Sequence, residues 1–256
     1  MTEIGTPATA AAGEGLSTRP LSQGDRVIDT FIAPTKTFTD ILRDQSWWFP
    51  FLIMLVIGYG FVFAVEKRVG WDQVLENALK TNTSQADQIN NAPVEQRPVV
   101  RSRMVASYRY ISYAFPVFVL FYWVLASAVL LGTLNFGFGG QAKYRQIFAV
   151  FVYAGLPGSI KSVLSIIVLY AGLSGESFQL QNPVGTNLGY YLPTDSPKWL
   201  LSLGSSLDVF TIWTVVLLII GSSIVAKVKR GSAAVAVVGW WILLTMVSVG
   251  FAAFQG

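Results

Sequence analysis

The sequence predicts an all-α fold: a polytopic membrane protein with a five-transmembrane-helix bundle and N-terminal amphipathic interfacial helices. The first observation is a set of five apolar stretches long enough to cross a hydrocarbon core, for which a helix needs about 20 residues. The second is composition, because 53% of the residues are hydrophobic and 12% are charged, against about 25% charged in soluble domains. The mean hydropathy of +0.52 agrees with both observations.

The residue inventory excludes most familiar catalytic sites. The chain contains no Cys and no His, which removes thiol nucleophiles, disulfides, imidazole bases and the commonest ligands of transition metals. The net charge is +4, but the Lys and Arg residues are scattered along the edges of the apolar stretches, so nucleic acid is not an expected partner. We therefore expect a protein that is not an enzyme and that carries no metal and no cofactor.

The N-terminal region divides into a tail and two short helices. Residues 1–23 are rich in Ala, Thr, Gly and Ser and lack the apolar core of a cleavable signal, which predicts a disordered cytoplasmic tail. Within residues 24–46, apolar side chains recur at helical spacing on either side of Pro34, which predicts amphipathic helices too short to span. They lie on the membrane surface or, as the alternative, against the cytoplasmic ends of the bundle. Four aromatic residues are candidate interfacial anchors: Phe31, Phe38, Trp47 and Trp48.

Residues 47–256 form the predicted five-helix transmembrane domain. Its spans are expected at about residues 49–65, 110–134, 147–172, 199–225 and 233–254. A polar external loop, residues 66–109, joins the first two spans and is long for a bundle connection. Apolar side chains on one helical face of residues 71–79 predict a small helical cap within this loop.

The cations of the short loops predict the orientation, because Lys and Arg concentrate on the cytoplasmic side. Lys143 and Arg145 precede the third span, and three further cations follow the fourth: Lys227, Lys229 and Arg230. This distribution places the N-terminus in the cytoplasm and the C-terminus outside, in the cytoplasmic (inner) membrane. Several cations of the loop 66–109 run against the rule, which weakens for long loops that also carry acids.

Two ionisable residues lie deep in the predicted spans, Lys161 in the third and Asp208 in the fourth. Counting about 1.5 Å per residue, they lie roughly 16 Å and roughly 14 Å from the external ends of antiparallel helices, and therefore at similar depth. An unpaired charge there costs several kcal/mol, so an ion pair is expected. Small polar residues nearby are candidates for completing a polar network: Ser162, Ser165, Ser205 and Thr211.

Three alternatives for these two residues remain open from the sequence alone. The first is a structural lock, since polar side chains commonly join transmembrane helices. The second is a polar pathway. Gly155, Pro157 and Gly158 are compatible with it, because a proline removes a backbone hydrogen bond and predicts a kinked or broken third span. Broken helices are common at transport sites. The third is that Lys161 and Asp208 do not meet. Apart from the pair, a Ser–Lys dyad of Lys161 with Ser162 or Ser165 is an enzymatic alternative, for which no nucleophile elbow is visible.

Two motifs resemble those of a known family. They are a Pro-Thr-Phe segment, Ala33-Pro34-Thr35-Lys36-Thr37-Phe38-Thr39-Asp40-Ile41, and a Trp-Pro start to the first span, Trp47-Trp48-Phe49-Pro50. With five spans and an external C-terminus, residues 27–254 resemble the bacterial branch of the Yip family, the Ypt/Rab-interacting-protein domain. The resemblance implies a polytopic helical membrane protein. Eukaryotic members act in vesicle traffic by binding small GTPases, but their Tyr-Gly-Pro motif is not evident here, which makes small-GTPase binding doubtful.

Two functions of different classes follow. The first is a non-enzymatic membrane scaffold/adaptor or accessory subunit of a membrane complex, which contacts membrane lipids and a membrane-protein partner or a second copy of the chain. The alternative is a small transporter or channel-like subunit that uses the Lys161/Asp208 polar site. The two are distinguished by whether this site faces a hydrated cavity or dry helix contacts.

Overall fold

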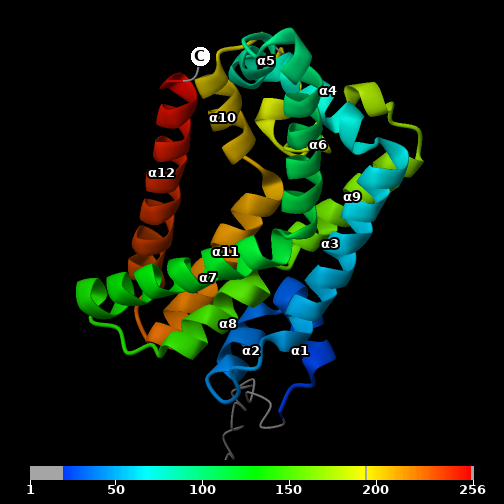
Figure 1. Cartoon of the computed structure of the whole chain (residues 1–256). Coiled ribbons are helices and arrows are strands. Elements are labelled where there is room, and N and C mark those ends of the chain that lie inside the picture. Colours follow the sequence, from blue (N-terminus) through cyan, green and yellow to red (C-terminus); the bar gives the residue numbers. More distant parts are fainter. Residues whose placement is uncertain (1–19, 194, 255–256) are drawn as a thin grey trace, which may run out of the picture.

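A computed structural model describes residues 20–193 and 195–254 (Figure 1). Within these residues the chain is helical and has no strand, only an isolated bridge between Asn187 and Asp208. Five helical segments are long and apolar enough to cross a membrane: Trp48–Arg68, Phe115–Gly137, Tyr144–Tyr170, Val209–Ala226 and Arg230–Phe254. The predicted all-α fold with five candidate spans is confirmed. Most of the tail predicted at 1–23 lies outside the described residues.

Two N-terminal helices, α1 (Gln23–Ile32) and α2 (Pro34–Ile41), lie at the lower end of the bundle as drawn in Figure 1. α1 begins with a capping box, in which Ser22 Oγ accepts a hydrogen bond from the Asp25 N–H at 3.1 Å. α2 begins at Pro34, because proline has no N–H to leave unsatisfied in a first helical turn. The buried faces of both helices pack against the bundle, because Phe38 and Ile41 belong to its core and Val27 and Phe31 pack on that core.

The contact between α2 and the bundle depends on a glycine. Phe38 of α2 is fully buried against α11 (Val209–Ala226) and α8 (Tyr144–Ala154). A Cβ atom on Gly221 of α11 would lie 2.9 Å from the Phe38 ring and 2.6 Å from Val150 of α8, closer than real Cβ contacts. The missing side chain at position 221 therefore lets three helices meet.

The first span, α3 (Trp48–Arg68), leads into a helical cap. The cap consists of α4 (Trp71–Thr81), α5 (Thr83–Asn90), a 3₁₀ turn (Val94–Gln96) and the upper part of α6 (Arg97–Tyr113). Trp71, Val74 and Leu75 form the buried face of α4. Asn77 of α4 donates hydrogen bonds to the carbonyl oxygens of Gly175 and Phe178 at 2.7 and 2.8 Å, which joins the cap to the loop after the third span.

Three of the predicted spans are interrupted rather than continuous. The segment predicted at 110–134 begins on α6, turns sharply at Ala114 and continues as α7 (Phe115–Gly132) (Figure 1). The third is divided between α8 and α9 (Pro157–Tyr170), and the fourth, predicted at 199–225, between α10 (Lys198–Ser206) and α11. The fifth span is a single unbroken helix, α12 (Arg230–Phe254).

Prolines account for two of these breaks. Pro116 and Pro157 lie in the first turns of α7 and α9, where each lacks the N–H that would continue the preceding helix. The break of the fourth span carries no proline. It lies at Leu207 and Asp208, where the Asp208 side chain caps the N-terminus of α11.

Replacing Gly221 with Leu is expected to destabilise the protein by about 1–3 kcal/mol, because the added side chain overpacks the junction of α2, α8 and α11. Gly231→Leu is the matched control, since a Cβ atom on Gly231 meets nothing within 4 Å. Thermal unfolding in detergent measures both variants. Equal melting temperatures for the two would show that the glycine contact does not hold α2 in place.

Candidate functional site

Asp208 forms the centre of a buried polar cluster. Its Oδ2 atom accepts from Lys161 Nζ at 2.9 Å and from Thr186 Oγ1 at 2.6 Å. Its Oδ1 atom accepts from the N–H groups of Phe210 and Thr211 at 2.9 and 3.3 Å. Because the Asp208 side chain is only 3% exposed and the Lys161 side chain 25% exposed, this pair lies largely out of solvent. The carboxylate is thus an ion-pair partner and a helix cap at once.

The loop between α9 and α10 completes the cluster. Thr186 also accepts, through its carbonyl oxygen, from the Val209 N–H at 3.0 Å. Next to it, Asn187 donates to Asn182 Oδ1 at 3.1 Å, and Asn182 in turn donates to Ser205 Oγ at 2.9 Å. The loop therefore reaches the break between α10 and α11 and supplies hydrogen bonds there.

The structure brings Lys161 and Asp208 together but leaves most of their predicted supporting residues apart. Ser162 and Ser165 donate to carbonyl oxygens of their own helix, at 3.2 and 2.7 Å. Thr211 contributes its backbone N–H, and Ser205 bonds to Asn182 rather than to the pair. Thr186 was missed, because no periodic pattern marks a loop residue that turns inward.

The four candidate anchors differ in their surroundings. Phe38 is fully buried within the protein. Phe31 packs edge-on against Trp213 at 5.6 Å between ring centroids, and Trp47 packs edge-on against Phe148 at 5.2 Å. Trp48 is 55% exposed. Among the four, Trp48 has the largely exposed side chain, whereas Phe38 belongs to the core.

A second buried ion lies at the lower end of the bundle and was not predicted. Arg26 of α1 is fully buried; its guanidinium contacts Asp40 at 2.6 Å and Asp44 at 3.1 Å. Arg26 Nη1 also donates to the Asp44 carbonyl oxygen at 3.0 Å, and the Arg26 carbonyl oxygen accepts from Thr30 and Thr37. We call these five residues the Arg26 clamp; they fasten α1 to α2 and to the segment before α3.

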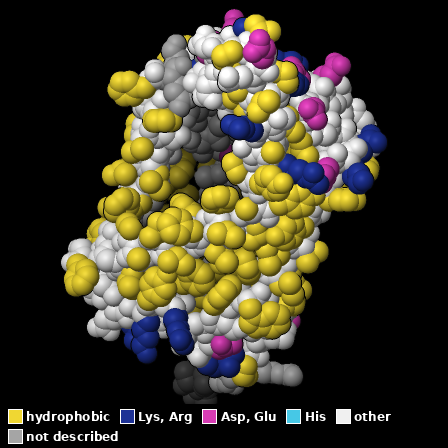
Figure 2. Space-filling view, in the orientation of Figure 1, with side chains coloured by type: hydrophobic (Ala, Val, Ile, Leu, Met, Phe, Trp, Pro, Cys, Tyr) yellow, Lys and Arg dark blue, Asp and Glu magenta, His cyan; other side chains and the backbone are white. Residues whose placement is uncertain are grey.

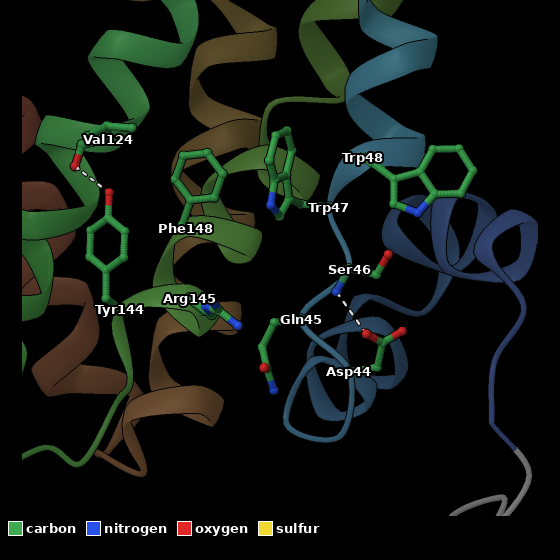
Figure 3. A pocket seen from close by; sticks show the side chains of 9 residues that line it. All are labelled: Asp44, Gln45, Ser46, Trp47, Trp48, Val124, Tyr144, Arg145 and Phe148. Atoms are coloured by element: carbon green, nitrogen blue, oxygen red, sulfur yellow. Dashed lines mark hydrogen bonds between the residues drawn. The ribbon is translucent and has the colours of Figure 1, made fainter.

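Next to the Arg26 clamp lies an open cleft of about 730 Å³, here called the interfacial cleft (Figure 3). Its lining residues are Asp44, Gln45, Ser46, Trp47, Trp48, Val124, Tyr144, Arg145 and Phe148. Tyr144 donates a hydrogen bond to the Val124 carbonyl oxygen at 3.1 Å, which fixes α8 against α7. In Figure 3 the rings of Trp47 and Phe148 lie above the Arg145 side chain.

The cluster around Asp208 predicts a measurable coupling. Asp208→Ala is expected to lower the free energy of unfolding by about 3 kcal/mol, because it leaves Lys161 without its partner and removes the cap of α11. Adding Lys161→Met to Asp208→Ala should recover part of the loss, since the uncompensated charge is gone. Asp208→Asn keeps an oxygen that can cap α11, so its free energy of unfolding should lie between those of the wild type and Asp208→Ala. Equal stability of the single Ala variant and the double variant would argue against an energetic ion pair.

Comparison with known proteins places the chain in a family. The family model of the Yip1 domain matches residues 28–252, which include the Lys161–Asp208 pair and all residues of the interfacial cleft. No curated protein and no solved structure matches the chain. No group of three or more acidic side chains that could hold a metal ion occurs among the described residues. The match covers nearly the whole helical bundle, and the chain therefore belongs to the Yip1 domain family.

Proposed function

We propose that the protein is a non-enzymatic membrane scaffold/adaptor or accessory subunit whose N-terminal helices bind a membrane-protein partner. The observation that carries this proposal is the outer face of α1, where Ile28 and Ile32 are 58% and 74% exposed while Arg26 on the inner face is fully buried. A helix held this firmly presents its apolar side chains in a fixed geometry. Such preorganisation reduces the entropy lost on binding.

The polar cluster supports the same proposal. Both carboxylate oxygens of Asp208 are occupied by partners within the protein, and two of these partners are backbone N–H groups that begin α11. A group with this many fixed partners is suited to holding helices and a loop together. We therefore assign the Lys161–Asp208 pair to structure.

Recovery of the tagged protein from native membranes in mild detergent tests the proposal. A partner present in stoichiometric amount is expected with the wild type, and the double variant Ile28→Ser, Ile32→Ser should lose it at least tenfold. Val94→Ser is the matched control, because Val94 is 73% exposed but belongs to the cap between α5 and α6. Equal recovery with both variants would mean that α1 is not the binding face.

A transport role is the second candidate, and the breaks in two helices favour it. The α8–α9 break and the α10–α11 break flank Lys161 and Asp208, and discontinuous helices commonly frame the sites of transporters. Ion flux into liposomes containing the purified protein distinguishes the candidates. The scaffold predicts the same flux as empty liposomes, whereas flux that Asp208→Asn abolishes would support transport.

We propose further that the lower end in Figure 1 is cytoplasmic and that the protein lies in the inner membrane. Figure 2 shows a hydrophobic belt with charged side chains at both ends, mostly Lys and Arg below it and a larger share of Asp and Glu above. At the upper end, Arg109 pairs with Glu66 at 3.2 Å and Arg101 pairs with Glu76. Pairing with acids accounts for Arg101 and Arg109, two of the cations on this side that otherwise run against the positive-inside rule.

Because the chain contains no Cys, single cysteines test this orientation directly. A membrane-impermeant maleimide added to spheroplasts is expected to label Asn90→Cys, in the cap, and to label Gln141→Cys, between α7 and α8, only after lysis. Both positions are exposed in the protein, so access from each side decides the result. The reverse pattern would invert the topology.

A further inference from the structure

We propose that the interfacial cleft binds one anionic phospholipid, with Arg145 contacting the phosphate and the wall formed by Val124 and Phe148 contacting an acyl chain. Arg145 and Phe148 belong to the first turns of α8, whereas Val124 belongs to α7. The cleft thus combines a cation with an apolar wall, and this combination is complementary to an amphiphile with an anionic headgroup. This site is separate from the exposed face of α1 proposed above for a protein partner.

Arg145 is the charge of the cleft that has no ion-pair partner in the described part of the chain, although an acid also lines it. Asp44 is the one carboxylate among the lining residues, and it is already paired with the buried Arg26 at 3.1 Å. Its Oδ1 atom also accepts from the Ser46 N–H at 3.1 Å. Arg145, in contrast, is exposed and forms no ion pair within the described residues. An anion entering the cleft therefore meets one uncompensated guanidinium.

Arg145 is one of five exposed cations at or just before the starts of α8 and α12 that form no ion pair within the described residues. We call this set the basic rim: Lys143, Arg145, Lys227, Lys229 and Arg230, all of them exposed. The two loops that carry the rim are joined by a hydrogen bond from the Gln141 N–H to the Ala226 carbonyl oxygen at 3.0 Å. A fixed group of cations at a membrane surface attracts anionic lipids.

The position of the cleft favours a lipid as the occupant. Trp48 begins the first candidate span and Tyr144 begins the third, so the cleft lies where two spans start on the same side of the bundle. Figure 2 shows the Lys and Arg side chains of this end directly below the hydrophobic belt. Trp and Tyr are enriched at this level of a membrane because their rings contact both chains and headgroups. A headgroup at Arg145 would leave its chains within the belt.

Native mass spectrometry of the full-length protein, released from nanodiscs that contain phosphatidylglycerol and phosphatidylcholine, tests the proposal. We expect one phosphatidylglycerol molecule to remain bound to the wild type. Arg145→Gln should weaken its retention about tenfold, which corresponds to about 1.4 kcal/mol. Val124→Trp should weaken it as much without changing any charge, because Val124 is 43% exposed and its enlarged side chain fills the cleft.

Two controls separate a built site from general attraction to an anionic surface. Arg230→Gln removes a cation of the basic rim that does not line the cleft, and it should change retention less than twofold. Excess glycerol phosphate, which has the headgroup without the chains, should not displace the lipid. The proposal is overturned if Val124→Trp retains the lipid normally, if Arg230→Gln and Arg145→Gln have equal effects, or if glycerol phosphate competes fully.

Discussion

The carboxylate of Asp208 resolves a difficulty that every interrupted transmembrane helix creates. Where α10 ends and α11 begins, backbone N–H groups lose their helical partners, and in a medium without water each unsatisfied group costs several kcal/mol. Asp208 accepts from Phe210 and Thr211, while the carbonyl oxygen of Thr186, in the loop between α9 and α10, accepts from the preceding N–H group, that of Val209. Lys161 then balances the charge at 2.9 Å. This one side chain thus contacts the loop, α9 and the start of α11 at the break of the fourth span.

The Arg26 clamp follows the same physical rule at the other end of the bundle. Desolvating an ion is costly, and the cost is recovered only where the geometry satisfies most of its hydrogen-bonding groups. The Arg26 guanidinium meets two carboxylates and a carbonyl oxygen, which locks α1 onto α2 and onto the start of α3. Between the two polar clusters, contacts such as Phe38 against Gly221 are apolar and close. Polar clusters thus fix position, while small residues permit approach.

The fold could be predicted because the bilayer imposes length and hydropathy on each span, and the Lys161–Asp208 pair could be predicted because depth follows from counting residues. The residues that surround the pair could not be predicted. Thr186 and Asn182 come from a loop, and loops have no period from which an inward turn can be read. The sequence places Arg26 on the polar face of its helix, but its burial could not be predicted, because such a face has the same pattern whether it meets water or two carboxylates. The sequence likewise does not distinguish the two aromatic residues Phe38 and Trp48. Tertiary packing buries Phe38 in the core and leaves Trp48 exposed.

We infer that the cluster around Asp208 is a dry structural lock within the bundle. Hydrogen–deuterium exchange of the wild type in nanodiscs, read at the amides of Val209, Phe210 and Thr211, tests it most directly. The hydrogen bonds to Thr186 and Asp208 predict exchange as slow as in the middle of α11. Exchange within seconds at these amides would reveal a hydrated site that opens readily, and the structural assignment of Lys161 and Asp208 would then be wrong.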